Sequence, residues 1–213
     1  MKFKKEHLLL YLVTDSRWTY DKTLPMQVED AIQGGVTMVQ YREKTLTGKE
    51  YIQNAFAIKK ICNKHKVPFV IDDNLVLAKE IGADGVHLGQ NDAAIDYARI
   101  VLGDDKIIGA SAHNVKEALK AQQDGADYIG VGAVFGSKTK TNVCSMTPEL
   151  LKKIKASVSI PVVAIGGINE NNIGLLKNSG VDGVAVVSAI LAKLDVKNAA
   201  KEMKIKVKEI VND

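Results

Sequence analysis

The sequence predicts an α/β fold, a single (β/α)8 TIM barrel that spans residues 1–213 as one domain. Short apolar runs alternate along the chain with longer segments in which apolar residues recur every three to four positions, a pattern of buried strands and amphipathic helices. Eight strands in strict alternation with eight helices imply a parallel sheet with right-handed crossovers. The 213 residues suffice for one buried core, and they lie near the short end of the roughly 200 to 400 residues known for this barrel.

The strands are predicted at the short apolar runs. They are residues 8–13, 36–40, 68–71, 84–88, 106–109, 127–131, 161–165 and 182–186. The clearest helical patterns span residues 47–65, 114–124, 148–156 and 188–210. We expect the last of these to pack on the exterior of the barrel.

An internal repeat favours a closed barrel over an open sheet. The segments GVTMV, GADGV, GADYI and GVDGV begin at Gly35, Gly82, Gly125 and Gly180. Each consists of a glycine that ends a helix, two connector positions and an apolar strand, and each precedes an even-numbered strand. Their spacing is about the length of two βα units, so four copies make eight units. A doubly wound open sheet is the alternative.

Composition narrows the classes of partner. Hydrophobic residues make up 46% and charged residues 25% of the chain, with a formal net charge of +4 and lysines spread along the sequence. This suits anionic small molecules at least as well as nucleic acid. No apolar run approaches the roughly 18 residues of a membrane span, and the two cysteines show no metal-binding spacing. We expect a cytoplasmic protein that binds neither nucleic acid nor membrane; a homo-oligomer is left open.

The second strand ends in a dense group of polar and charged residues. Active sites of this barrel form at the C-terminal ends of the strands. Alternation places Gln40, Arg42 and Lys44 on one face, and Tyr41 and Glu43 on the other. Two cations and an amide at the barrel mouth suit an anion with several oxygens. The alternative is a solvated loop with surface charges.

Carboxylates follow the third and fourth strands. The third ends in Asp72, Asp73 and Asn74, and the fourth is followed by Asp92. Asp73 and Asp92 each precede a helical pattern, so helix capping is one interpretation. The other is an Mg²⁺ ion that bridges the protein and a diphosphate, because Mg²⁺ takes one or two carboxylates together with phosphate oxygens and water.

The last three strands predict a second anion subsite. The turn at Gly166 and Gly167 and the helix start in VSAI occupy the usual phosphate cradle of this fold, where backbone N–H groups face the anion. The loop after the sixth strand adds hydroxyls and a cation at Ser137, Thr139 and Lys140.

Other signals carry less weight. The run GVGAVFG has GxGxxxG spacing and follows the sixth strand, so it does not predict a dinucleotide site. His87 and His113 are candidate acid–base groups, although a histidine in a strand is more often a hydrogen-bonded structural residue.

The ordered set of motifs resembles one family. VQYREK, DGVHLGQND, GASAHN, the threonine and lysine of the loop after the sixth strand, VVAIGGI and VAVVSAI appear in sequence over nearly the whole chain. Together they resemble thiamine phosphate synthase, also called thiamine-phosphate pyrophosphorylase. The resemblance implies a (β/α)8 transferase that joins a hydroxymethylpyrimidine diphosphate to a thiazole phosphate, or its carboxylated form, with Mg²⁺ and release of diphosphate.

The resemblance also implies site residues. Pyrimidine and diphosphate would be bound by Gln40, Arg42, Lys44, Ser111 and Lys140, of which all except Gln40 are assigned as catalytic. Asp73 and Asp92 would be the Mg²⁺ ligands. The thiazole phosphate would meet Ser137, Thr139, Gly166, Gly167, Val187 and Ser188, and the substrate-binding set further includes Tyr41, Glu43, Asp72 and Lys138.

The chain departs from the family pattern at two places. Asp72 stands where the family usually has asparagine, which replaces an amide by a group that only accepts hydrogen bonds when ionised. Phe135, Gly136 and Ser137 stand where Phe-Pro-Thr is usual. The alternatives are a sibling barrel that acts as a thiazole tautomerase, a sugar-phosphate isomerase or epimerase, and a phosphate-binding barrel without catalysis.

Overall fold

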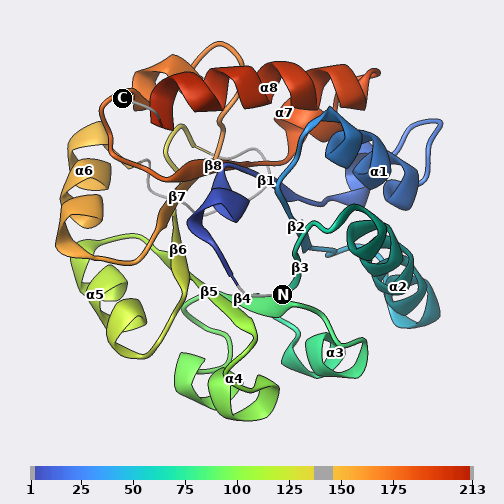
Figure 1. Ribbon diagram of the computed structural model, residues 1–213, viewed down its shortest axis with the longest axis horizontal. Helices are drawn as coiled ribbons and strands as arrows, with labels where there is room; N and C mark the ends of the chain where they lie inside the picture. The colour runs from blue at the N-terminus through green and yellow to red at the C-terminus, as the bar shows by residue number, and fades with distance from the viewer. Residues whose placement is uncertain (1–2, 137–145, 212–213) are drawn as a thin grey trace.

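In the computed structural model, which describes residues 3–136 and 146–211, eight strands close into a parallel barrel (Figure 1). They are β1 (Leu10–Val13), β2 (Met38–Tyr41), β3 (Phe69–Asp72), β4 (Gly85–Leu88), β5 (Ile107–Ala112), β6 (Tyr128–Val131), β7 (Val162–Ile165) and β8 (Gly183–Val186). Each strand pairs in parallel with the next along the chain, and β8 pairs with β1, with Val184 opposite Leu10. The predicted (β/α)8 barrel is confirmed, and the open doubly wound sheet is excluded.

The helices form a ring outside the strands (Figure 1). They are α1 (Leu24–Gly34), α2 (Gly48–His65), α3 (Leu75–Glu80), α4 (Ile95–Leu102), α5 (Val115–Gln123), α6 (Pro148–Ser157), α7 (Ser188–Leu191) and α8 (Val196–Val211). Three short 3-10 helices are η1 (Lys5–Leu8), η2 (Ser16–Trp18) and η3 (Ile173–Leu176). Helices predicted at 47–65, 114–124 and 148–156 are therefore present with ends shifted by at most one residue.

Two details of the predicted alternation are wrong. The segment after β7 contains η3 where an α-helix was expected, and its asparagines and Gly174 are poor helix formers. The single helix predicted over 188–210 is split into α7 and α8. The break has a local cause, because the Asp195 carboxylate accepts the N–H of Asn198 at 2.9 Å and so caps a new helix.

The strands alternate between two buried layers. One layer fills the inside of the barrel and includes Tyr11, Met38, Ile107, Tyr128 and Val163. The other layer packs between the strands and the helices, and neighbouring strand residues such as Leu12 and Val39 belong to it. This two-residue period follows from strand geometry. The inner layer fills the barrel, so a ligand must bind at one of its ends.

The internal repeat corresponds to a hydrogen-bonded device that we name the strand clasp. It consists of Thr37, Asp84, Asp127 and Asp182, each two residues after a helix-ending glycine with positive φ. The side chain of each accepts the N–H of the first or second residue of the previous strand, at 2.7 to 2.9 Å. The backbone N–H of each also donates to the carbonyl oxygen of that same residue. The clasps thus join β1 to β2, β3 to β4, β5 to β6 and β7 to β8.

Replacement of Asp182 by asparagine is expected to lower the free energy of unfolding by about 2 kcal/mol at neutral pH. Burial by itself raises the pKa of the Asp182 carboxyl, but hydrogen bonds from Lys155, Lys5 and the Val162 N–H outweigh it and lower the pKa below its usual 3.8. Its stabilisation is therefore full above pH 3.8 and is lost as pH falls through the lowered pKa. Urea unfolding at several pH values tests this, because the difference between variant and wild type should vanish in acid.

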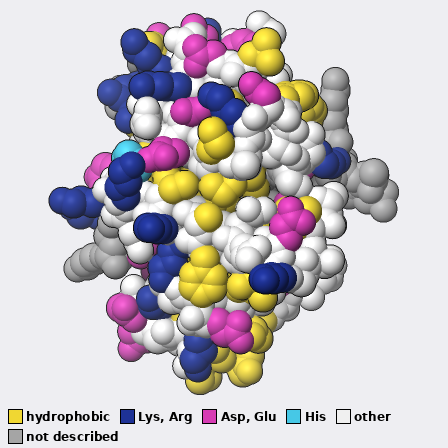
Figure 2. Space-filling model, turned by 90° about the vertical axis from the view of Figure 1, so that its right-hand side faces the viewer, with side chains coloured by type: hydrophobic (Ala, Val, Ile, Leu, Met, Phe, Trp, Pro, Cys, Tyr) yellow, Lys and Arg dark blue, Asp and Glu magenta, His cyan; other side chains and the backbone are white. Residues whose placement is uncertain are grey.

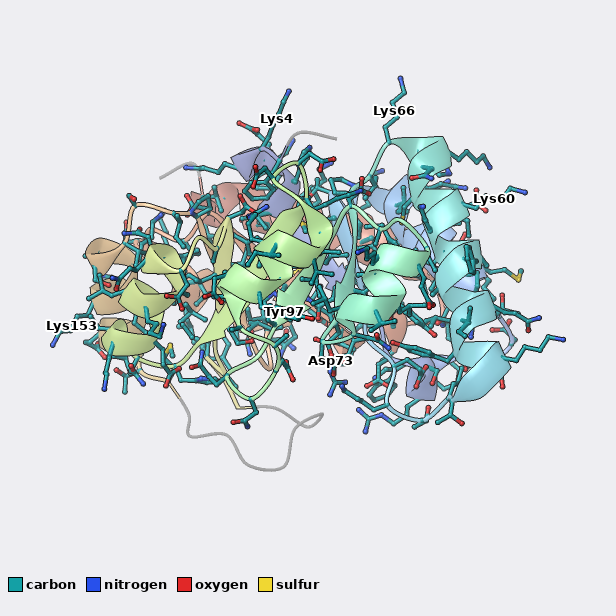
Figure 3. All side chains as sticks on the ribbon, turned by 90° about the horizontal axis from the view of Figure 1, so that it is seen from below. Lys4, Lys60, Lys66, Asp73, Tyr97 and Lys153 are labelled. Carbon is teal, nitrogen blue, oxygen red and sulfur yellow. The ribbon has the colours of Figure 1, made fainter. Side chains whose placement is uncertain are left out.

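The two ends of the barrel differ in character. Figure 3 shows Asp73, which follows β3, at the edge of the molecule opposite to Lys4 and Lys66, which precede strands. The face over α1 and α2 mixes Lys and Arg with Asp and Glu around apolar side chains (Figure 2); Met26, Ile52 and Phe56 are exposed on these helices. Across the part of the chain that the structure describes, no helix is long and apolar enough to cross a membrane.

Candidate functional site

A cavity of about 540 Å³ opens at the C-terminal ends of the strands. Eight of the assigned substrate-binding residues line it: Gln40, Arg42, Asp72, Ser111, Gly166, Gly167, Val187 and Ser188. The candidate acid–base groups His87 and His113 line it as well. The eight residues come from both sides of the barrel. On one side, Gln40 lies in β2, Arg42 in the turn after it and Asp72 in β3. On the other side, the glycine pair follows β7, and Val187 and Ser188 follow β8. Ser137, Lys138, Thr139 and Lys140 lie outside the described residues.

The end of β2 places Gln40 and Arg42 at the cavity. Gln40 faces the inside of the barrel, like Met38 of the same strand, and is 4% exposed. Thr14, at the end of the neighbouring β1, fixes the backbone of Arg42: its Oγ1 accepts the Arg42 N–H at 2.9 Å and donates to the Arg42 carbonyl oxygen at 3.0 Å. The guanidinium therefore projects from a backbone segment that is hydrogen-bonded on both sides.

Tyr41 and Glu43 point elsewhere, as strand alternation requires. Tyr41 is buried between the barrel and α2, where its hydroxyl donates to the Tyr51 carbonyl oxygen at 3.0 Å. The Glu43 carboxylate accepts the N–H groups of Thr45 and Leu46 at 2.7 and 3.2 Å and so folds back onto its own loop. Among the described residues that line the cavity, neither side chain is present.

A cluster of four charges forms the rim beside β2 and β3. Arg42 Nε lies 3.6 Å and Lys44 Nζ 3.5 Å from Asp72 Oδ2, and Lys44 also donates to Asp73. Burial by itself lowers the pKa of Lys44, but the hydrogen bond to Asp73 and the two carboxylate charges raise it above the usual value. Lys44 is therefore a cation at neutral pH, and the two cations are partly neutralised before a ligand binds.

Asp73 and Asp92 are not helix caps, so that interpretation is wrong. Asn74 caps α3, since its Oδ1 accepts the Leu77 N–H at 2.9 Å. Asp73 instead adopts a left-handed backbone with φ of 55°, a conformation that Asp and Asn tolerate better than most residues. The Asp92 carboxylate accepts the Gly89 N–H at 2.6 Å, and α4 begins without a side-chain cap.

The carboxylates after β3 and β4 are the candidate ligands for a metal. Asp73 and Asp92 follow β3 and β4, which are paired neighbours. Within residues 3–136 and 146–211, no group of three or more His, Cys, Asp or Glu side chains is placed to hold a metal ion. A pair of carboxylates is the type of site that would suit Mg²⁺, which commonly completes its shell with water and substrate phosphate oxygens.

The opposite wall is a glycine turn held by two asparagines. Gly166 and Gly167 have φ of 104° and 66°, and a Cβ on Gly167 would lie 2.7 Å from the Phe135 carbonyl oxygen. The Nδ2 groups of Asn169 and Asn172 both donate to the Gly167 carbonyl oxygen, at 3.1 and 2.9 Å. Both the positive φ and the close contact with the segment after β6 therefore require glycine at these positions. In the sequence, the asparagines of GGINENN were the signal for this turn.

The floor of the cavity contains Tyr11 and Gly130, to which sequence reasoning gave no role, and His87, which it named as a candidate acid–base group. The His87 side chain is 8% exposed. His87 is hydrogen-bonded on both ring nitrogens, to Tyr128 and to Ser111 at 3.0 Å each. Strand alternation could have predicted Tyr11, because it lies on the same face of β1 as Val13, which also lines the cavity.

Comparison with known proteins identifies the family. Residues 10–190 match the family model described as thiamine monophosphate synthase. A thiamine-phosphate synthase of Ruminiclostridium cellulolyticum is 49% identical over 203 residues, covering 95% of this chain and 96% of that protein. One from Clostridium tetani is 48% identical over 194 residues, covering 91% and 93% respectively.

A solved structure gives the same result. The thiamine phosphate pyrophosphorylase of Pyrococcus furiosus superposes with a TM-score of 0.87 at 37% sequence identity, covering 97% of this chain and 98% of that one. Sequence and fold agree over nearly the full length of each relative. The chain is therefore a transferase of thiamine biosynthesis that belongs to the thiamine monophosphate synthase family.

Proposed function

We propose that the protein condenses 4-amino-2-methyl-5-hydroxymethylpyrimidine diphosphate with thiazole phosphate, or its carboxylated form, to give thiamine phosphate and diphosphate. The single observation that carries this is the two-sided cavity, with Arg42 and Asp72 on one wall and the Gly166–Gly167 turn on the other. Lys44 and Asp73 lie at the rim, where Lys44 pairs with both carboxylates. One wall suits a diphosphate with its metal, and the other suits a single phosphate held by backbone N–H groups.

In the proposed reaction the pyrimidine CH₂–O bond breaks largely before the thiazole nitrogen attacks. The diphosphate leaves with the electron pair of that bond, and the nitrogen lone pair then forms the new C–N bond. Arg42 and Lys44 hold the charge that accumulates on the departing oxygens, in positions fixed before the reaction starts. Lys140, outside the described residues, is proposed to act with them. Mg²⁺, bound by Asp73 and Asp92, would supply further positive charge at the same oxygens.

The other substrate contacts are assigned by position. Gln40 and Ser111 face the pyrimidine side of the cavity; Val187 and Ser188 line it beside the glycine turn and are proposed to meet the thiazole phosphate. Ser137 and Thr139 are also proposed to contact the thiazole phosphate. We propose that one barrel domain in the cytoplasm performs the reaction. No general base is required for the bond-forming step.

The test is product formation by the purified protein. The two substrates and Mg²⁺ are mixed, and thiamine phosphate is measured with and without a chelator. Metal-dependent product supports the proposal. Absence of product, with both ligands shown to bind by calorimetry, would contradict it and favour the thiazole tautomerase or the non-catalytic phosphate-binding alternative.

Replacement of Asp72 by asparagine is expected to tighten binding of inorganic diphosphate about two- to fivefold in the presence of a chelator. The substitution removes the carboxylate that lies 3.6 Å from Arg42 and 3.5 Å from Lys44, so both cations become more available to the anion. Calorimetric titration measures the change, and Asp104→Asn, an exposed site ahead of β5, is the matched control. Weaker binding by Asp72→Asn would contradict this account.

A further inference from the structure

A continuous chain of hydrogen bonds crosses the floor of the cavity. Gln40 Nε2 donates to the Tyr11 hydroxyl at 2.8 Å, and the Tyr11 and Tyr128 hydroxyl oxygens lie 2.8 Å apart. The Tyr128 hydroxyl lies 3.0 Å from His87 Nδ1, and His87 Nε2 lies 3.0 Å from Ser111 Oγ. We name these five residues the floor chain. It connects two residues of the proposed pyrimidine site through three rings to which no role has been given.

The barrel makes specific room for these rings. A Cβ on Gly109 of β5 would lie 2.2 Å from Cζ of Tyr128, so that ring is accommodated only because the strand has no side chain there. A Cβ on Gly130 of β6 would lie 3.2 Å from Cε1 of His87. Tyr11 and Tyr128 are 1% and 0% exposed. Two glycines inside strands carry an entropic cost, which indicates that the rings serve a purpose at these places.

The buried hydroxyls keep their hydrogens. Burial raises the pKa of both Tyr11 and Tyr128, so both are protonated at neutral pH. Each hydroxyl then has one hydrogen to donate, and leaving such a hydrogen without an acceptor in a buried place is unfavourable.

One direction of donation satisfies every group of the floor chain. Because the Gln40 amide nitrogen donates to Tyr11, the Tyr11 hydrogen is directed to Tyr128, and the Tyr128 hydrogen to Nδ1 of His87. The imidazole is then neutral and carries its hydrogen on Nε2, which donates to Ser111 Oγ. At one end the Gln40 amide oxygen remains an acceptor, and at the other the Ser111 hydroxyl remains a donor. Both of these residues line the cavity.

We infer that Tyr11, Tyr128 and His87 are positioning residues that lock the Gln40 amide and the Ser111 hydroxyl into one orientation before a ligand binds. The locked amide offers an oxygen acceptor beside its second N–H donor, which matches an aromatic ring with an amino group next to a ring nitrogen. The identity of that ring as the pyrimidine substrate rests on the proposed function. The direction of hydrogen-bond donation along the floor chain does not rest on it.

Tyr128 is the informative position, because it is absent from the described lining of the cavity and reaches the ligand only through its neighbours. Tyr128→Phe removes one oxygen and keeps the ring. We expect kcat/KM for the pyrimidine diphosphate to fall about tenfold, with KM for the thiazole phosphate unchanged.

Thr37→Val is the matched control. It removes a hydroxyl that donates to the His7 carbonyl oxygen at 2.8 Å and accepts the Leu10 N–H at 2.9 Å, at the other end of the barrel. This variant should lose stability without a change in either KM. If Tyr128→Phe changes both KM values equally, or shows the kinetics of Thr37→Val, the positioning role is overturned.

The last experiment determines where His87 carries its hydrogen in the ligand-free protein, and it does not depend on enzyme activity. Nitrogen-15 NMR of labelled histidine distinguishes a ring protonated at Nε2 from one protonated at Nδ1 or at both, and the chain has four histidines, so His87→Gln assigns the signal. We expect wild-type His87 to be neutral with its hydrogen on Nε2, and Tyr128→Phe to give mixed tautomers. An Nδ1-protonated, doubly protonated or mixed ring in the wild type would overturn the inference. A wild type that gives the expected signal but no thiamine phosphate would instead contradict the proposed function alone.

Discussion

The Asp73→Asn variant is expected to lose about 10²- to 10³-fold in kcat. Asparagine is nearly the same size and tolerates the left-handed φ of 55° at this position, so the backbone should be retained. The substitution removes a charge that pairs with Lys44 and that we assign to the metal. An amide oxygen is a weaker ligand than a carboxylate for a hard cation such as Mg²⁺. The loss should therefore appear together with a higher Mg²⁺ requirement.

Steady-state rates across an Mg²⁺ titration measure both effects. The Asp104→Asn variant serves as the control, because it removes one negative charge at an exposed site ahead of β5 and far from the mouth. It should leave the rate and the Mg²⁺ dependence as in the wild type. Turnover of Asp73→Asn equal to that of the wild type would exclude Asp73 as a ligand of a catalytic metal.

The Gly183→Ala variant is expected to lose about 3 kcal/mol or more in the free energy of unfolding. Gly183 begins β8, where the last strand meets the first, and a Cβ there would lie 1.9 Å from the carbonyl oxygen of Leu8. The contact is with backbone and not with a mobile side chain, so the added methyl group must push the seam between β8 and β1 apart. Gly183 has no positive φ, so this collision is the reason for the expected loss.

Urea unfolding gives the measurement, and Gly174→Ala gives the comparison. Nothing lies within 4 Å of a Cβ built on Gly174 in η3, so alanine should be tolerated there. A lower midpoint with unchanged slope for Gly183→Ala would mean that stability alone has changed. Equal midpoints for the two variants would show that the seam adapts without cost.

Much of the fold could be predicted because the signals are local. Each strand is a short apolar run, and the repeat that begins at Gly35, Gly82, Gly125 and Gly180 marks a clasp that recurs once per two strands. The errors arose where a local polar group overrides periodicity. Asp195 caps α8 and divides a stretch whose apolar spacing alone reads as one helix.

The site was predictable only where strand parity could be read. Strand alternation separated Gln40 and Arg42, which line the cavity, from Tyr41 and Glu43, which do not. It also grouped Lys44 with the first two, but Lys44 lies at the rim and not in the lining. The resemblance by itself grouped all five together. The bond between the Tyr11 and Tyr128 hydroxyls joins residues 117 positions apart. Such a contact depends on closure of the barrel, and nothing in either strand taken separately indicates it.

The strand clasps affect how readily the protein can acquire new chemistry. They sit where strands begin, whereas the proposed ligands sit where strands end; β3, for example, begins at a clasped Phe69 and is followed by Asp73. Charged groups gather at the mouth, whereas the hydrogen bonds of the clasps lie at the other end of the same strands. Residues around the mouth can therefore be exchanged during evolution while the clasps at the N-terminal ends of the strands maintain the register of the barrel.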